Sequence, residues 1–159
     1  MNEINPNYGD IKHLPIEHNW LIPSQEDLAR KFADEFEKLL NQVENSWINQ
    51  SDIPDYVIGF LEALIDAMKH GNNFDPEKMV KVNILFDDNK LEISITDSNP
   101  VAFTNEEARQ KIAEATKPEN LERGSGRGLL MMNHYYPDGL NFEFLNPGNK
   151  VTMTKLKNQ

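Results

Sequence analysis

One segment, EALIDAMKHGNN, carries acidic side chains at helical spacing. Glu62, Asp66 and His70 follow one another at intervals of four residues, so a helix would present all three on one face. Two carboxylates one turn apart repel each other, and a nearby cation would remove that penalty. The pattern fits either a solvated acidic face or a metal-nucleotide site, with one group on the metal and the other as general base.

Asp97 ends an alternating segment in the sequence ITDSNP. An aspartate at the point where a strand leaves its sheet often caps a turn. Inside an otherwise apolar pocket, the same carboxylate could accept a hydrogen bond from an exocyclic amine. The residue type alone leaves both roles open.

A glycine-rich segment, Gly124-Ser125-Gly126-Arg127-Gly128-Leu129, precedes an apolar run that predicts a helix. Glycines let the backbone approach a ligand closely, and the free amides of a helix start bind anions. Arg123 and Arg127 add positive charge here. Flexible loops also collect glycine, and the segment does not follow a strand in a βαβ unit, which argues against a Rossmann site.

Two helices are predicted from 3.6-residue periodicity. The first spans about residues 24–48, with Ser24 as N-cap and Asp27 as its partner in a weak capping box. Phe36, Leu40 and Trp47 lie beside its main apolar stripe, and we expect them to belong to the core. The second begins at the Ser51–Pro54 segment and ends at Gly71.

The remaining elements alternate between periods of two and 3.6. We expect a short strand near Lys12–Ile16, a polar helix around Asn105–Ala115 and a helix at the apolar run from Leu129. Two hairpins are predicted, one over residues 80–95 and one over residues 140–153. This order predicts an α+β fold, a two-layer sandwich with a mixed, mostly antiparallel sheet covered by helices on one face. We expect a flexible arm at residues 1–10 and a single domain at 11–159.

Composition restricts the function further. The 159 residues hold 16 Lys and Arg against 26 Asp and Glu, a net charge of −10, which argues against non-specific binding to nucleic acid. No stretch reaches the roughly 18 apolar residues of a membrane span, and the first residues do not resemble a secretion signal. The absence of cysteine excludes thiolate chemistry and is compatible with a reducing compartment. We therefore expect a cytoplasmic protein that binds neither membrane nor nucleic acid.

The order of these motifs resembles the GHKL ATPase superfamily, and within it most closely the bacterial anti-sigma-factor serine kinase family. The resemblance covers about residues 12–156, and its most specific parts are the HGN ending of the helix and the GSGRGL box. It implies a histidine kinase-like ATPase domain that uses ATP and Mg²⁺. It also implies two protein partners, a sigma factor and an anti-anti-sigma antagonist, and a homodimer.

The resemblance also implies roles for individual residues. Glu62 matches the general base, Asp66 stands at the position of a magnesium-binding asparagine, and Asp97 matches the aspartate that recognises the adenine amine. A lid is implied at about residues 103–123. The other implied nucleotide contacts are His70, Gly71, Asn72, Asn99, Arg123, Gly124, Ser125, Gly126, Arg127, Gly128 and Leu129.

Two positions depart from the family pattern. Asp66 adds a negative charge beside the phosphates, which makes nucleotide affinity more dependent on metal. Asn99 replaces the usual glycine of an Asp-x-Gly turn; asparagine tolerates the left-handed region, so the turn is expected to survive while the pocket narrows.

These features support a first hypothesis of a kinase that phosphorylates the antagonist. A second hypothesis is a partner-binding module that has lost efficient catalysis, and a third is an interaction domain without nucleotide. A sensor histidine kinase is disfavoured, because 159 residues leave no separate phosphoacceptor hairpin. Kinase and hydrolase would share the same base and metal.

Overall fold

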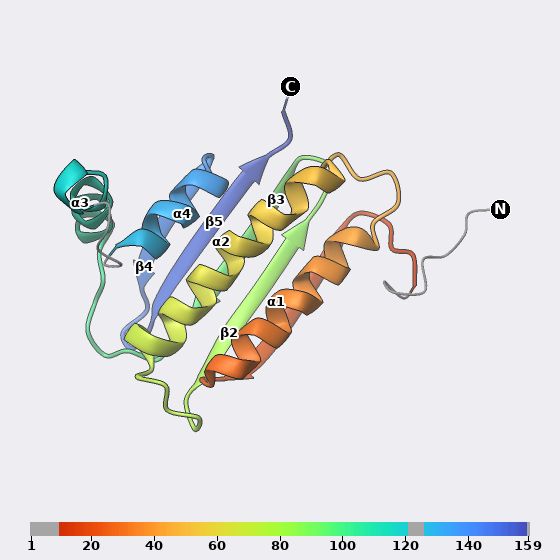
Figure 1. The fold of residues 1–159 in the computed structure, drawn as a ribbon. Coiled ribbons are helices and arrows are strands. Elements are labelled where there is room, and N and C mark those ends of the chain that lie inside the picture. The colour runs from red at the N-terminus through yellow and green to blue at the C-terminus, as the bar shows by residue number, and fades with distance from the viewer. Residues whose placement is uncertain (1–9, 121–125, 159) are drawn as a thin grey trace.

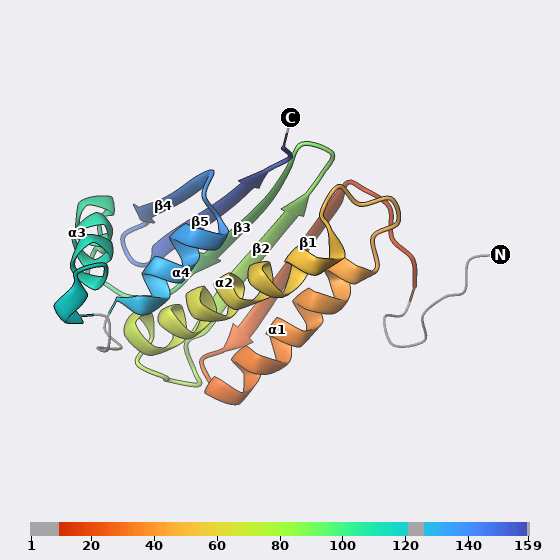
Figure 2. The same cartoon turned by 45° about the horizontal axis from the view of Figure 1, so that its top comes forward.

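The computed structural model describes residues 10–120 and 126–158. Its sheet has five strands in the order β1-β2-β3-β5-β4, and each neighbouring pair is antiparallel (Figures 1 and 2). The strands are β1 (Ile16–Pro23), β2 (Met79–Phe86), β3 (Lys90–Thr96), β4 (Gly139–Phe144) and β5 (Asn149–Leu156). The helices are α1 (Glu26–Asn41), α2 (Ile53–Asp66), α3 (Asn105–Ala115) and α4 (Arg127–Tyr135). Shorter helical turns lie at Gln50–Asp52, Ala67–Gly71 and Pro118–Asn120.

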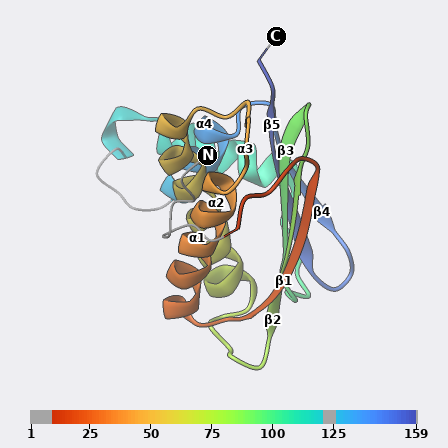
Figure 3. The same cartoon turned by 90° about the vertical axis from the view of Figure 1, so that its right-hand side faces the viewer.

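Among the described residues, helices cover only one face of the sheet (Figure 3). The inward side chains of β2 and β3 alternate with polar ones, and those at Val82, Ile84, Leu91 and Ile93 are at most 1% exposed. They pack with Phe36 and with the inner stripes of α1, α2 and α4 in one core. The predicted two-layer α+β fold is confirmed, and its sheet is antiparallel at every pairing instead of mixed.

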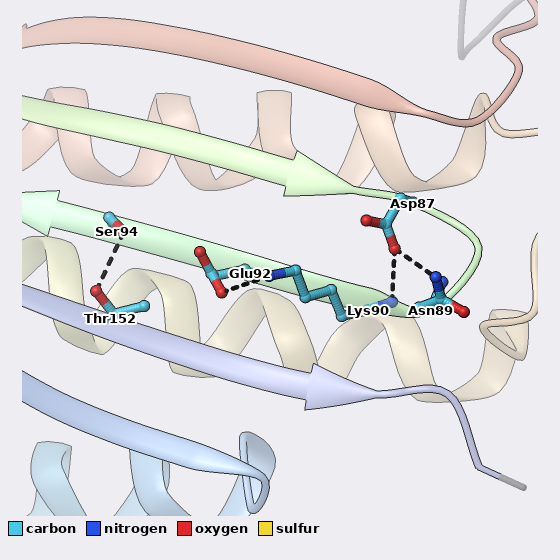
Figure 4. Close-up of polar contacts among 6 residues, drawn as sticks. All are labelled: Asp87, Asn89, Lys90, Glu92, Ser94 and Thr152. Carbon is cyan, nitrogen blue, oxygen red and sulfur yellow. Dashed lines mark hydrogen bonds and ion pairs between the residues drawn. The ribbon is translucent and has the colours of Figure 1, made fainter.

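The uncovered face of the sheet carries local polar contacts (Figure 4). Asp87 Oδ1 accepts from the backbone N–H groups of Asn89 and Lys90 at 2.8 and 2.9 Å, which closes the β2–β3 turn. Across two strands, the hydroxyls of Ser94 and Thr152 lie 3.2 Å apart. These contacts join residues within the sheet and its turn.

The first strand differs from the prediction. It runs over Ile16–Pro23 instead of Lys12–Ile16, because Pro15 lacks the N–H that a paired strand needs. The inward side chain of Trp20 makes edge contacts with the rings of Phe32 and Phe60. Lys12 forms only an isolated parallel bridge, with Val43.

The first helix is shorter than predicted and begins differently. It spans Glu26–Asn41, its N-cap is Gln25, and no side chain caps it. Ser24 is fully buried, and its hydroxyl donates to the carbonyl of Lys78 at 2.6 Å, so it is not the N-cap. After Asn41 the chain turns through Asn45, which has a positive φ. Phe36 and Leu40 are buried, as expected for core residues.

Helix α4 is fixed against α2 by a buried tyrosine. The hydroxyl of Tyr136 donates to the carbonyl of Tyr56 at 2.7 Å, and its ring is fully buried. Gly59 makes room for that ring, since a Cβ there would lie 2.6 Å from it. This contact holds the C-terminal end of α4 against α2. None of the helices among the described residues is long and apolar enough to cross a membrane.

Candidate functional site

The acidic residues lie where α2 changes its winding. Glu62 and Asp66 are one turn apart at the end of α2, and Ala67–Gly71 continue as a π-helical turn. Such turns insert an extra residue into a helix and are frequent at functional sites. His70 is exposed near the end of this turn, four residues after Asp66.

Burial raises the pKa of Asp66 above its ordinary value. The carboxylates of Asp97 and Glu62 add to the rise, whereas His70 and Lys111 oppose it. Lys111 belongs to α3, far along the chain from α2. The backbone carbonyl of Lys111 would lie 3.1 Å from a Cβ at Gly126, so the described part of the predicted lid lies beside the start of α4.

Asp97 directly follows the last residue of β3, at the end of the sheet that lies against Gly71. Its Oδ1 accepts two backbone hydrogen bonds, from Asn99 and Asn149, both 2.9 Å long. Burial nevertheless raises the pKa of Asp97, outweighing these two N–H groups, which lower it. The described residues provide no hydrogen bond to Oδ2, so this oxygen can accept one from a ligand.

Gly71 brings the end of the helix against this carboxylate. A Cβ at position 71 would overlap Asp97 Oδ2 and lie 2.5 Å from the Cβ and Cγ atoms of Asp97. No residue with a side chain fits here without movement of Asp97. The predicted pair Gly71 and Asp97 is therefore in direct contact.

The start of α4 faces Glu62. A Cβ at Gly128 would lie 3.0 Å from Glu62 Oε2, which places the first turn of α4 beside this carboxylate. Leu130 N–H is bonded to the carbonyl of Gly126, so the amides of Arg127, Gly128 and Leu129 precede the first bond of the helix. These three amides form the part of the predicted anion site that the structure describes. Leu129 itself has a buried side chain.

Helix α3 lies beside the start of α4 and is anchored to the edge strand β4. Asn105 Oδ1 accepts from Phe142 N–H at 2.7 Å, and its amide donates to Asn141 Oδ1 at 2.9 Å. The Phe103 ring contacts that of Phe142 edge-on. Lys111 lies over the Phe103 ring at 5.3 Å. The helix matches the predicted range Asn105–Ala115, and the structure attaches it to β4.

Asn72 and Asn99 make contacts that the sequence did not reveal. Asn72 is fully buried, and its amide is engaged by protein groups, so it offers no free polar atom to a phosphate. Asn99 is not among the residues with positive φ, contrary to expectation. It forms an Asx turn instead: its Oδ1 accepts from Val101 N–H at 2.9 Å, and its Nδ2 donates to the carbonyl of His70 at 3.2 Å.

Sequence reasoning missed Ser24, Asn149 and Lys111. The motif NPGN marks a turn at Asn149, but only the fold brings that turn to Asp97. Arg123, Gly124 and Ser125 lie outside the described residues, as does the end of the predicted lid. Within residues 10–120 and 126–158, no three histidine or acidic side chains gather as a metal cluster. Glu62 and Asp66 still offer the oxygen donors that Mg²⁺ prefers.

Comparison with known proteins gives a consistent result. A family model described as "Histidine kinase-like ATPase domain" matches residues 22–155. Proteins named "Anti-sigma F factor" are similar to this chain: one from Geobacillus sp. (strain WCH70) is 34% identical over 94 residues, and one from Geobacillus stearothermophilus is 33% identical over the same length. These alignments cover 59% of this chain and 62% of each relative. The chain thus matches about three fifths of the length of these relatives.

A solved structure supports the fold independently. It is titled "The crystal structure of SiaB-SiaC complex from Pseudomonas aeruginosa", and it aligns with a TM-score of 0.63 at 15% identity. The alignment covers 87% of this chain and 88% of that one. At this identity the match concerns the fold alone.

Proposed function

Because the chain belongs to the histidine kinase-like ATPase family, we propose that it is an ATP-binding anti-sigma factor that phosphorylates a serine of an antagonist protein. Its partners would be a sigma factor and this antagonist, between which it switches. The observation that carries the proposal is the convergence of three segments distant in sequence. Glu62 meets Gly128 at the start of α4, and Asp97 meets Gly71 at the end of the same helix that carries Glu62.

The proposal gives these groups complementary tasks. Asp97 Oδ2 would accept the hydrogen bond of the adenine amine, while the first amides of α4 and the Arg127 side chain would bind phosphate oxygens. Glu62 would take the proton of the attacking serine hydroxyl as the phosphoryl group moves to that oxygen and ADP leaves. Asp66 would hold Mg²⁺, which neutralises phosphate charge when bound.

Equilibrium binding of ATP and ADP, with and without Mg²⁺, tests the nucleotide site. We expect micromolar dissociation constants that depend on Mg²⁺, since Asp66 otherwise places an uncompensated charge beside the phosphates. The Glu62→Gln variant should bind ATP within about threefold of wild type but lose about 100-fold or more in phosphoryl transfer. Glu92→Gln, on the uncovered sheet face, is the matched control. Absence of binding at millimolar ATP would refute the proposal.

A second candidate function follows from Asp66. The raised pKa shows that its charge is costly in this setting, and the family pattern has a neutral asparagine there. A partner-binding module with weak catalysis would bind nucleotide in the Asp66→Asn variant, without faster phosphoryl transfer. Restored transfer in that variant would favour the kinase.

A further inference from the structure

A buried side-chain amide connects the two halves of the Asp97 site. Asn72 Oδ1 accepts from the backbone N–H of Ser98 at 2.8 Å. Its Nδ2 donates to Ser24 Oγ at 3.0 Å and to the carbonyl of Met79 at 3.2 Å. We call these four residues, Ser24, Asn72, Met79 and Ser98, the Asn72 cluster. It joins the end of the π-helical turn to the residue that directly follows Asp97.

Three groups, the Ser98 N–H, the Met79 carbonyl and Ser24 Oγ, together fix the orientation of this amide. The hydroxyl proton of Ser24 is directed at the carbonyl of Lys78, at 2.6 Å, so the oxygen faces Asn72 as an acceptor. A flipped amide would direct Nδ2 at the N–H of Ser98 and Oδ1 at the carbonyl of Met79. Both contacts would then be repulsive and buried, which costs more than a lost hydrogen bond at the surface. Only one orientation is therefore satisfied.

The cluster lies next to the contact between Gly71 and Asp97. Asn72 follows Gly71 and Ser98 follows Asp97, so the bond between them holds the two backbones together on one side. A second bond, from Asn99 Nδ2 to the carbonyl of His70, crosses the same pair on the other side but is exposed. Ser24 and Asn72 are both fully buried, so their bonds are protected from water.

We propose that Ser24 and Asn72 are positioning residues that set the place of Asp97 Oδ2 and thereby the preference of the site for a purine that carries a 6-amino group. The inference rests on the proposed function, because it assumes that Asp97 faces adenine. Adenine presents its 6-amino group as a donor. A carboxylate discriminates by this group only if its oxygen is held at hydrogen-bond distance.

The test compares ATP with purine riboside triphosphate, which has hydrogen in place of the amine. Binding of each is measured by calorimetry for wild type and for Ser24→Ala, Ser24→Thr and Asn72→Ala. We expect Ser24→Ala to weaken ATP binding about tenfold, the effect of losing one hydrogen bond to a charged group. Binding of the analogue should not change, so the ratio of the two dissociation constants approaches one. Ser24→Thr keeps the hydroxyl and should restore discrimination.

The ratio separates positioning from stability. Partial unfolding lowers the apparent affinity for both nucleotides by the same factor. This factor cancels in the ratio, so even a destabilised Asn72→Ala protein remains informative. Ser94→Ala is the matched control, because Ser94 is also a buried serine with a side-chain hydrogen bond, here to Thr152 on the uncovered face (Figure 4). It should retain the discrimination of wild type.

The outcomes distinguish this inference from the proposed function. If wild type prefers ATP and the Ser24→Ala and Asn72→Ala variants prefer it to the same degree, the positioning role is overturned and the proposed function stands. Wild type that binds both nucleotides equally would overturn the amine contact of Asp97 and this inference with it. Wild type that binds neither would overturn both proposals.

Discussion

Two aspartates stand at opposite ends of β3, and each accepts two backbone hydrogen bonds through its Oδ1 atom. Asp87 Oδ1 accepts from the N–H groups of Asn89 and Lys90, while Asp97 Oδ1 accepts from those of Asn99 and Asn149. The two differ in what surrounds the carboxylate. Asp87 lies in the turn between β2 and β3, at one end of the sheet (Figure 4), whereas Asp97 lies against Gly71, the last residue of the π-helical turn that follows α2.

The turn-capping role of Asp97 is therefore compatible with its proposed ligand-binding role. The first oxygen of Asp97 satisfies the local backbone, and the second remains available in partly desolvated surroundings, where burial raises the pKa of the group. A hydrogen bond to a charged acceptor is stronger there than in water. Removing the second oxygen of each aspartate therefore tests whether only one end of the strand is functional.

The largest expected effect is that of Asp97→Asn. The variant keeps Oδ1 for the two backbone donors but puts an N–H donor where the adenine amine also donates. ATP binding should weaken about 100-fold or more, which corresponds to about 2.7 kcal/mol. Asp87→Asn should leave ATP binding unchanged. Calorimetry on both variants measures this, and equal losses of affinity would contradict the comparison.

Gly71→Ala should have the next largest effect. The added methyl group must displace the carboxylate of Asp97, so ATP affinity should fall by about tenfold or more, in line with one lost charged hydrogen bond. Gly139→Ala is the control, because its Cβ would meet Thr154 at 3.4 Å, an ordinary contact. If Gly71→Ala binds ATP like wild type, Asp97 does not contact the ligand in the position described.

Asp66→Asn should change stability in a pH-dependent way. Burial raises the pKa of Asp66 in the folded protein, so its ionised form opposes folding above that pKa. The neutral amide removes this cost, and we expect a gain on the order of 1 kcal/mol at pH 7. Below the unfolded-state value of 3.8 both side chains are neutral in both states, so the gain should vanish.

Urea unfolding at several pH values measures this gain. The gain should shrink as the pH falls from the folded pKa toward 3.8, because wild-type Asp66 then takes up its proton. A gain for Asp66→Asn that persists at pH 3 would show that it comes from packing and not from charge.

The fold was accessible from the sequence because its signals are local. Alternation predicted both hairpins, and the polar helix at Asn105–Ala115 matches its predicted range. The predicted boundaries of helices and strands were wrong where tertiary contacts decide them. Ser24 has the residue type of an N-cap, but the carbonyl of Lys78 takes its hydroxyl, and that contact joins residues 54 positions apart.

The site was predictable in its residues but less so in their roles. The motifs named Glu62, Gly71 and Asp97, and the structure brings each against a neighbour from another segment. Asn72 was assigned to phosphate by resemblance, whereas its amide is used within the protein. Such hydrogen bonds depend on four separate segments meeting, which no periodicity in one chain encodes.

The smallest expected effect concerns the ion pair on the uncovered face. Lys90 Nζ lies 3.1 Å from Glu92, and about a third of each side chain is exposed (Figure 4). Exposed pairs of this kind contribute little, so Glu92→Gln should lower the free energy of unfolding by at most about 0.5 kcal/mol, and less in high salt.

A double-mutant cycle with Lys90→Met isolates the pair, and ATP binding should stay at the wild-type value throughout it. Binding should not change because the pair lies near the Asp87 end of β3, on the sheet face opposite the described helices. A change in ATP affinity in the Glu92→Gln variant would mean that this face is coupled to the Asp97 end. The two ends of β3 would then be coupled. The different surroundings of Asp87 and Asp97 would not by themselves explain why only one of them affects ATP binding.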